Sequence, residues 1–247
     1  MSDFLFSLIG LLIPFFGTTL GSSFVFFLKN ISNNLSKSMI GFAVGVMLSA
    51  SIFSLLIPSI DLSTTRVVWI PSVVGFILGF VFLIIINLIT EKISNKKIDM
   101  LMFSVTLHNI PEGMAVGVAF ASFLVQNSNI NIMIPLMLSI GIAVQNIPEG
   151  SIISMPLNLK GKSKFMSFLY GSLSGIVEPI FAFLTILLLD LVVPILPYLL
   201  SFASGCMIYV IFWELIPQMH EEKKSILGII GIMIGFILMM ALDISFS

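Results

Sequence analysis

The hydrophobic residues of this chain occur in long runs, which short polar or turn-rich connections separate. A helix that crosses a membrane needs about 20 mostly apolar residues. The runs reach this length along nearly the whole sequence and predict transmembrane helices near residues 4–28, 38–60, 68–90, 100–125, 131–157, 166–189, 193–217 and 225–246. We therefore expect an all-α, polytopic membrane helix bundle of eight spans that forms one transmembrane domain over residues 1–247.

The composition agrees with a bundle that lies in lipid. Hydrophobic residues make up 58% of the chain and charged residues 9%, whereas soluble domains carry about 25% charged residues. The net charge of −1 gives no electrostatic basis for binding nucleic acid, so we expect no such partner. The chain starts MSDFLF, with no basic region and no cleavage-site pattern, so the first run is interpreted as a retained span.

The basic residues predict the orientation of the bundle. Only Arg66 falls on one side of the eight-span pattern. The lysines fall in the connections on the other side: Lys29, Lys37, Lys92, Lys96, Lys97, Lys160, Lys162, Lys164, Lys223 and Lys224. Basic residues in short loops mark the cytoplasmic face, so both termini are predicted to lie outside the cell, with the protein in the plasma membrane.

Glycines four residues apart recur in six of the predicted spans. Small residues at this spacing let helix backbones approach closely in membranes, so we interpret the pairs as packing sites and leave a homodimer open. The pairs are Gly17/Gly21, Gly41/Gly45, Gly75/Gly79, Gly113/Gly117, Gly171/Gly175 and Gly231/Gly235.

Four of the twelve acidic residues lie in the interior of apolar runs: Glu112, Glu149, Glu178 and Glu214. The other eight, Asp243 among them, are interpreted as residues at span ends or in loops. A carboxylate at the centre of a bilayer costs on the order of 3 kcal/mol even on lenient scales. No Lys or Arg lies within these runs to neutralise the glutamates. They therefore require protons, a cation or both.

Two of these glutamates belong to a repeated motif. The sequence His108-Asn-Ile-Pro-Glu-Gly113 returns in the next span as Gln145-Asn-Ile-Pro-Glu-Gly150. Residues four apart share a helix face, so each motif places its first residue beside its glutamate, with the asparagine next to them. Each proline removes one backbone hydrogen bond, which predicts kinked or unwound helices of the kind that line transporter cavities. Imidazole, carboxylate and amide ligands suit zinc, iron, manganese and cobalt, and the lack of a thiolate argues against copper(I).

The remaining intramembrane glutamates give weaker signals. Glu178 precedes a proline in Gly175-Ile-Val-Glu-Pro179, and Glu214 lies near the cytoplasmic end of its span, where a snorkelling carboxylate is a close alternative. A fainter repeat joins Phe42-Ala-x-Gly-x-Met47 to Phe202-Ala-x-Gly-x-Met207. The spans near 38–60 and 193–217, which cross the membrane in opposite directions, would then be equivalent members of two inverted repeats, as in many transporters.

The paired HNIPEG and QNIPEG motifs, with GIVEP and MLSASIFSLLIP elsewhere, resemble the bacterial-type branch of the ZIP (Zrt-, Irt-like) metal transporters. This resemblance implies a 3+2+3 arrangement of spans with extracellular termini. It implies a primary metal site at His108, Glu112, Gln145 and Glu149, with Met47 as an additional contact. It also implies a second site at Asn109, Asn146 and Glu178, which Glu112 and Glu149 bridge. Asn146 stands where some relatives have Asp, and Trp213 where a His is expected beside Glu214.

We therefore expect transport of a divalent metal, zinc above all, into the cytoplasm, with Ser51, Ser54 and Glu214 as candidates for the pathway. Iron, manganese, cobalt and cadmium remain open as transported ions, and no organic cofactor is expected. A proton-coupled carrier of another solute and a metal-selective channel also remain open. An enzyme is disfavoured, because an intramembrane metalloprotease would need HExxH and this chain has HxxxE.

Overall fold

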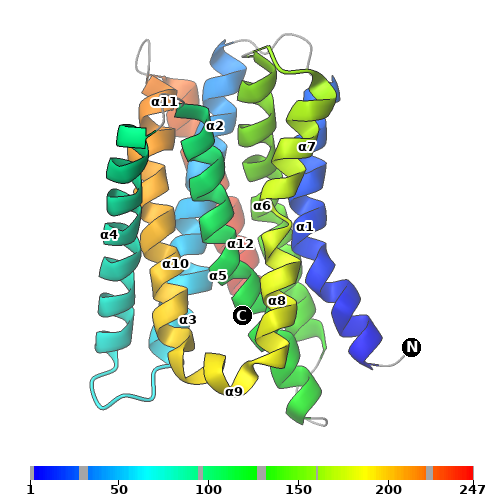
Figure 1. Cartoon of the computed structure of the whole chain (residues 1–247), viewed down its shortest axis with the longest axis vertical. Coiled ribbons are helices and arrows are strands. Elements are labelled where there is room, and N and C mark those ends of the chain that lie inside the picture. The colour runs from blue at the N-terminus through cyan, green and yellow to red at the C-terminus, as the bar shows by residue number, and fades with distance from the viewer. Residues whose placement is uncertain are drawn as a thin grey trace.

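The computed structural model describes residues 3–27, 33–93, 97–126, 132–159, 161–220 and 225–246, and these form a bundle of long helices (Figure 1). The longer helices are α1 (Asp3–Phe27), α2 (Asn33–Ala50), α4 (Trp69–Ile93), α5 (Lys97–Gln126), α6 (Met133–Leu159), α7 (Lys164–Ser174), α8 (Val177–Leu187), α10 (Leu196–Val210) and α12 (Ile226–Phe246). The shorter elements are η1 (Ser51–Leu56), α3 (Ile57–Asp61), α9 (Leu189–Val192), η2 (Val193–Ile195), η3 (Ile211–Leu215) and α11 (Ile216–His220). The predicted all-α class is confirmed.

Seven helices within the described residues are long and apolar enough to cross a membrane. They correspond to seven of the eight predicted runs, with ends that differ by a few residues. The remaining run, 100–125, lies in α5, where the apolar stretch found is the shorter Glu112–Ala121. The protein is therefore a polytopic helical membrane protein.

Glycines hold pairs of helices in close contact, as the spacing predicted. A Cβ on Gly21 of α1 would lie 1.8 Å from the carbonyl oxygen of Ile147 on α6. A Cβ on Gly113 of α5 would lie 2.4 Å from the carbonyl oxygen of Glu178 on α8. Such distances leave no room for a side chain. The helices that carry candidate ligands are thus packed backbone to backbone, which fixes their relative register.

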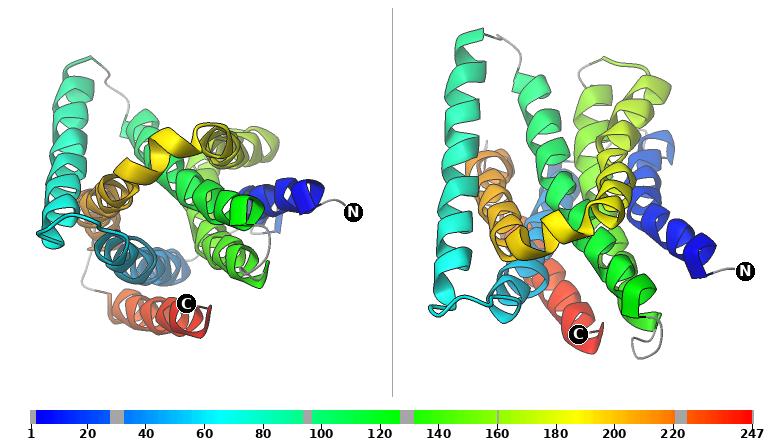
Figure 2. Two further views of the ribbon diagram at one scale, coloured as in Figure 1. Left: turned by 90° about the horizontal axis from the view of Figure 1, so that it is seen from below. Right: turned by 60° about the horizontal axis from the view of Figure 1, so that its bottom comes forward.

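The helices separate into two groups, here named the α1 group and the α2 group. In the α1 group, α1 packs along α6 and α7, and α5 packs along α8. In the α2 group, α2 packs along α12, and α10 packs along α4. From below, the red α12 and teal α4 lie on one side and the blue α1 with the yellow-green α7 and α8 on the other (Figure 2). Fewer contacts join the groups, chiefly α5 with α10 and α6 with α2.

Two spans contain π-helical turns that the sequence analysis did not anticipate. The turn η1 follows α2 and ends two residues before Pro58, and η3 follows α10 and ends two residues before Pro217. Proline lacks an N–H and clashes with the carbonyl four residues earlier, and a widened π turn relieves that conflict inside a helix. The two π turns begin at Ser51 and Ile211, which have the same separation as Phe42 and Phe202 of the faint repeat.

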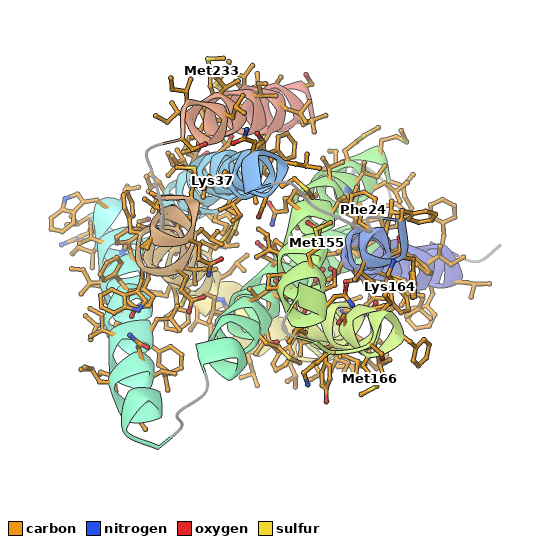
Figure 3. All side chains as sticks on the ribbon, turned by 90° about the horizontal axis from the view of Figure 1, so that it is seen from above. Phe24, Lys37, Met155, Lys164, Met166 and Met233 are labelled. Carbon is orange, nitrogen blue, oxygen red and sulfur yellow. The ribbon has the colours of Figure 1, made fainter. Side chains whose placement is uncertain are left out.

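Both chain ends lie at the lower end of the bundle in Figure 1, together with α9 and the connection 62–68. Lys37 and Lys164 lie at the opposite end, as the view from above shows (Figure 3). Lys164 Nζ donates a hydrogen bond of 3.0 Å to the carbonyl oxygen of Phe26 there. The other lysines predicted for this end, apart from Lys162, have side chains outside the described set.

Candidate metal site

Six of the predicted ligands are buried on three neighbouring helices. α5 contributes Asn109 and Glu112, α6 contributes Gln145, Asn146 and Glu149, and α8 contributes Glu178. None of the six side chains is more than 1% exposed. The repeated motif places its members on the faces of α5 and α6 that meet, and the close packing of Gly113 on Glu178 brings α8 to the same place.

Gln145 and Glu112 join the two copies of the motif directly. Gln145 Nε2 on α6 donates a hydrogen bond to Glu112 Oε1 on α5. Both residues belong to the predicted primary site, and Glu149 lies one helical turn beyond Gln145. The side chain of His108, the fourth predicted ligand of this site, lies outside the described set.

Asn146 and Glu178 form a second contact between helices. Asn146 Nδ2 donates to Glu178 Oε2 at 2.8 Å and to the carbonyl oxygen of Pro14 on α1 at 3.2 Å. Asn109 Nδ2 donates to the carbonyl oxygen of Ser174 at 3.3 Å. Gly113, the residue after Glu112, packs against the backbone of Glu178 and brings α5 beside this contact. The six described ligands on α5, α6 and α8 therefore form a polar cluster where these helices meet.

The side-chain amide oxygens of this cluster have no hydrogen-bond donor in the part of the chain that the structure describes. Among the described residues, Asn109 Oδ1, Gln145 Oε1 and Asn146 Oδ1 are buried and have no hydrogen-bond partner. Buried polar atoms are nearly always paired, and an exception requires a reason. Each amide nitrogen is already bonded, so the oxygen is what remains for a cation. No three His, Cys, Asp or Glu side chains in the described set form a metal-binding group by themselves.

Unwinding, one of the two outcomes that the prolines predicted, does not occur in α6. α6 continues as one α-helix through Pro148 and Pro156 and is not unwound. The interruption lies in the sixth span, where α7 ends at Ser174 and α8 begins at Val177. Glu178 is therefore in the first turn of a helix, where unpaired N–H groups favour a negative charge.

Met47 lies in a buried hydrophobic cluster made mainly of residues of the α2 group. That hydrophobic cluster also contains Ile152, which is three residues beyond Glu149, and it packs against Ala115, three residues beyond Glu112. Met47 thus belongs to the hydrophobic contact between the α2 group and the helices that carry the carboxylates.

The predicted pathway residues Ser51 and Ser54 lie in the π turn η1 and Glu214 lies in the π turn η3. The Ser51 hydroxyl donates to the carbonyl oxygen of Met47 at 2.7 Å, so it is turned toward its own helix. Ser54 donates to Asp243 Oδ1 on α12 at 2.6 Å. Glu214 is half-buried in η3 beside the exposed Trp213.

Two polar residues near these sites were missed by the sequence analysis. Thr18 of α1 is fully buried, and its hydroxyl donates to Glu178 Oε1 at 3.4 Å. A hydroxyl in the middle of an apolar first span was a usable signal for Thr18. Asp243 was set aside as a residue at a span end, and only the fold reveals its bond to Ser54.

Comparison with known proteins identifies the family. A family model described as ZIP Zinc transporter matches residues 99–243. Zinc transporter ZIP11 of Xenopus tropicalis is 29% identical, with 98% of each chain covered. Zinc transporter ZIPB of Bordetella bronchiseptica is 31% identical over 93% of this chain and 77% of that protein. Zinc transporter ZupT of Chlorobaculum parvum is 30% identical over 97% of each chain. Because the family match covers more than half of the sequence and these similarities extend along nearly all of it, the chain belongs to the ZIP zinc transporter family.

Proposed function

We propose that this protein transports divalent metal cations, zinc above all, from outside the cell into the cytoplasm. Membership of the ZIP family and the similarity to three proteins named zinc transporters support zinc as the transported ion. A polytopic bundle with intramembrane carboxylates is the architecture that such transport requires. Iron, manganese, cobalt and cadmium share the relevant ligand preferences and are the candidate competitors.

The primary site in this proposal consists of His108, Glu112, Gln145 and Glu149, with Met47 as an additional contact. The observation that carries it is the Gln145–Glu112 hydrogen bond, because it brings the two motif copies together and leaves Gln145 Oε1 available. Carboxylate and amide oxygens supplemented by an imidazole nitrogen would complete the coordination of a zinc ion.

The second site, formed by Asn109, Asn146 and Glu178 with Glu112 and Glu149 as bridges, is proposed to bind metal more weakly. Thr18 and Asn146 already donate hydrogen bonds to the two oxygens of Glu178. A cation at this position would have to compete with the Asn146 amide for Glu178 Oε2. Asn146 also contributes no charge, so the second site lacks the attraction that an aspartate would add.

We further propose eight spans in a 3+2+3 arrangement with inverted symmetry, all within one domain over residues 1–247. The pairing of α1 with α6 mirrors that of α8 with α5, and the pairing of α2 with α12 mirrors that of α10 with α4. The π turns η1 and η3 at matched positions support the same relation. Transport then follows when the α1 group rocks against the α2 group and opens the site to the cytoplasm.

The protein is proposed to lie in the plasma membrane. The lysine-rich end of the bundle is proposed to face the cytoplasm. Lys37 and Lys164 lie at the end opposite to both termini. The positive-inside rule then places the termini outside.

Zinc uptake into vesicles that contain the purified protein tests this function. Glu149→Gln keeps the shape of the side chain and removes its charge, and we expect the initial rate of uptake to fall at least about tenfold. Asp190→Asn is the matched control, because Asp190 is an exposed carboxylate on α9 and its loss should leave the rate unchanged. Undiminished uptake by Glu149→Gln would refute the site assignment.

Elemental analysis of the same protein separates the proposal from its alternatives. A metal carrier should retain zinc in proportion to protein, whereas a proton-coupled carrier of another solute should retain none. Uptake rates that do not saturate with zinc concentration would indicate a channel.

A further inference from the structure

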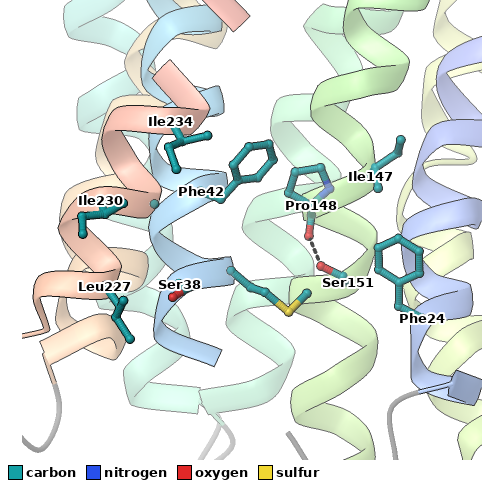
Figure 4. Close-up of a pocket in the computed structure, with 11 residues that line it drawn as sticks. Phe24, Ser38, Phe42, Ile147, Pro148, Ser151, Leu227, Ile230 and Ile234 are labelled. Atoms are coloured by element: carbon teal, nitrogen blue, oxygen red, sulfur yellow. Dashed lines mark hydrogen bonds between the residues drawn. The ribbon is translucent and has the colours of Figure 1, made fainter. Parts of the chain in front are cut away.

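An apolar pocket of about 320 Å³ lies on the boundary between the two helix groups (Figure 4). The α2 group contributes Ser38 and Phe42 of α2 with Leu227, Ile230 and Ile234 of α12. Phe24 of α1 with Ile147, Pro148 and Ser151 of α6 lies on the opposite wall. Pockets of about 300–1,000 Å³ commonly hold small molecules or parts of them.

The walls of this pocket offer almost no polar group to a ligand. The lining consists of hydrophobic side chains except for Ser38, Ser151 and the small Gly231. The hydroxyl of Ser151 donates to the carbonyl oxygen of Pro148 at 2.6 Å, so it is turned toward its own helix. A buried water needs about two to four polar partners, and roomy apolar cavities remain dry. The pocket therefore suits a hydrocarbon and neither water nor an ion.

The pocket belongs to the part of the bundle that lies in lipid. All four helices that line it are candidate membrane spans. Ile230 and Ile234 also have about half or less of their surface exposed on the outer face of α12, where the membrane surrounds the protein. The apolar molecules available at this depth are the acyl chains of the bilayer itself, at very high local concentration.

One end of the pocket lies toward the end of the bundle that carries lysines. Lys37 immediately precedes the lining residue Ser38 and lies at the end of the bundle where Lys164 also lies (Figure 3). Basic residues at the membrane surface attract lipid headgroups by about 1 kcal/mol each. The pocket thus has an apolar interior and lies toward the lysine-rich end of the bundle, where anionic headgroups of phospholipids are attracted.

We infer that the pocket binds one acyl chain of a phospholipid from the leaflet on the lysine-rich side, with the phosphate at that end of the bundle. The bound chain contacts α2 and α12 on one wall and α1 and α6 on the other. It therefore bridges the two helix groups. Its contact with Pro148 and Ser151 also brings it to the turn of α6 that carries Glu149. Occupancy of the pocket then resists relative movement of the groups and couples lipid composition to the transport rate.

Photo-cross-linking tests this inference without relying on transport. The full chain is reconstituted into vesicles of phosphatidylcholine and phosphatidylglycerol that contain a trace of phospholipid with a diazirine on its acyl chain. After irradiation, the labelled residues are identified by mass spectrometry of peptides. We expect labelling of the pocket residues several-fold above that of the outer faces of α4 and α12, which contact bulk lipid.

Two tryptophan variants of α12 provide a matched comparison. Ile234 and Ile237 are both 51% exposed on this helix, but only Ile234 lines the pocket. Ile234→Trp should fill the pocket and lower its labelling several-fold, whereas Ile237→Trp should leave the labelling unchanged. Leu227→Trp blocks the pocket from another position, so the test survives if Ile234→Trp fails to fold.

Equal labelling of the pocket and the outer faces, or equal labelling in both tryptophan variants, would overturn the inference. Protein-to-protein cross-links from cysteines placed in the pocket would instead identify a second copy as the occupant and would likewise overturn it. Zinc uptake measured in the same vesicles keeps the questions separate, because uptake without pocket labelling contradicts the lipid site and leaves the proposed transport intact.

Discussion

The Asn146 side-chain amide on α6 donates a hydrogen bond of 2.8 Å to Glu178 Oε2 on α8. A second bond from the same nitrogen reaches the carbonyl oxygen of Pro14 on α1. One asparagine therefore joins three helices of the α1 group at the level of the metal site. In the proposed mechanism, the Asn146 amide binds Glu178 as a neutral hydrogen-bond donor. An aspartate at this position would instead offer a second carboxylate to bind a cation.

Asn146→Asp should strengthen the second site. The change replaces an amide donor with a negatively charged acceptor, so Glu178 loses a donor and gains a neighbour with which it can share a cation. We expect the ratio of bound zinc to protein to rise, and elemental analysis of protein equilibrated with zinc measures this ratio. Asn158→Asp serves as the control, because Asn158 lies near the end of α6 and its amide also donates a hydrogen bond, to the carbonyl oxygen of Lys162. An unchanged ratio would contradict the role given to Asn146.

Thr18→Val should weaken zinc binding although Thr18 is not a proposed ligand. The valine keeps the volume of the side chain and removes the hydroxyl that bonds Glu178. Loss of a group that orients a ligand typically lowers metal affinity about 10–100-fold. Thr18→Ser should restore the affinity, as judged by zinc titration of the purified protein. Equal weakening in both variants would indicate a packing role for Thr18 instead.

Gly21→Ala should destabilise the bundle. The added Cβ would lie 1.8 Å from the Ile147 carbonyl oxygen, so α1 and α6 must separate. Overpacking typically costs about 1–3 kcal/mol, and the melting temperature in detergent should fall. Gly141→Ala is the control on α6, because the nearest atom to its new Cβ, Met239 Cε, is 3.9 Å away. Similar melting temperatures for both variants would show that the close approach is not required.

The orientation can be tested with single cysteines. The chain has one cysteine, Cys206, and it is buried. A membrane-impermeant thiol reagent added to intact cells should therefore label Thr65→Cys, in the exposed connection 62–68, and spare Ser163→Cys at the opposite end. Labelling of Ser163→Cys alone would reverse the proposed topology. The wild-type chain gives the background.

The sequence was sufficient for those features that repeat or follow a fixed spacing. The duplicated motif placed Glu112 and Gln145 on facing helices, and the spaced glycines marked the contacts between helix pairs. These signals are local, because a membrane span has a fixed length and a helix a fixed period. Which helices pair could not be predicted from the sequence, because a helix face that carries glycines can pack closely on many other helices.

The missed features depend on contacts between distant segments. Thr18 meets Glu178, and Ser54 meets Asp243, only after the chain has folded. The π turns were missed for another reason: a proline in a helix allows a kink, a break or a widened turn. Pro148 continues an α-helix, whereas Pro58 and Pro217 follow π turns, and the local sequence does not distinguish these outcomes.

The paired π turns also bear on the history of the chain. A π turn is in effect one residue inserted into an α-helix. If the two halves descend from one duplicated segment, an insertion made after the duplication would be present in only one copy. Its presence at matched positions, Ser51–Leu56 and Ile211–Leu215, would then place the insertion in an ancestor that consisted of a single half. That ancestor would have had to insert into the membrane in both directions and assemble with itself.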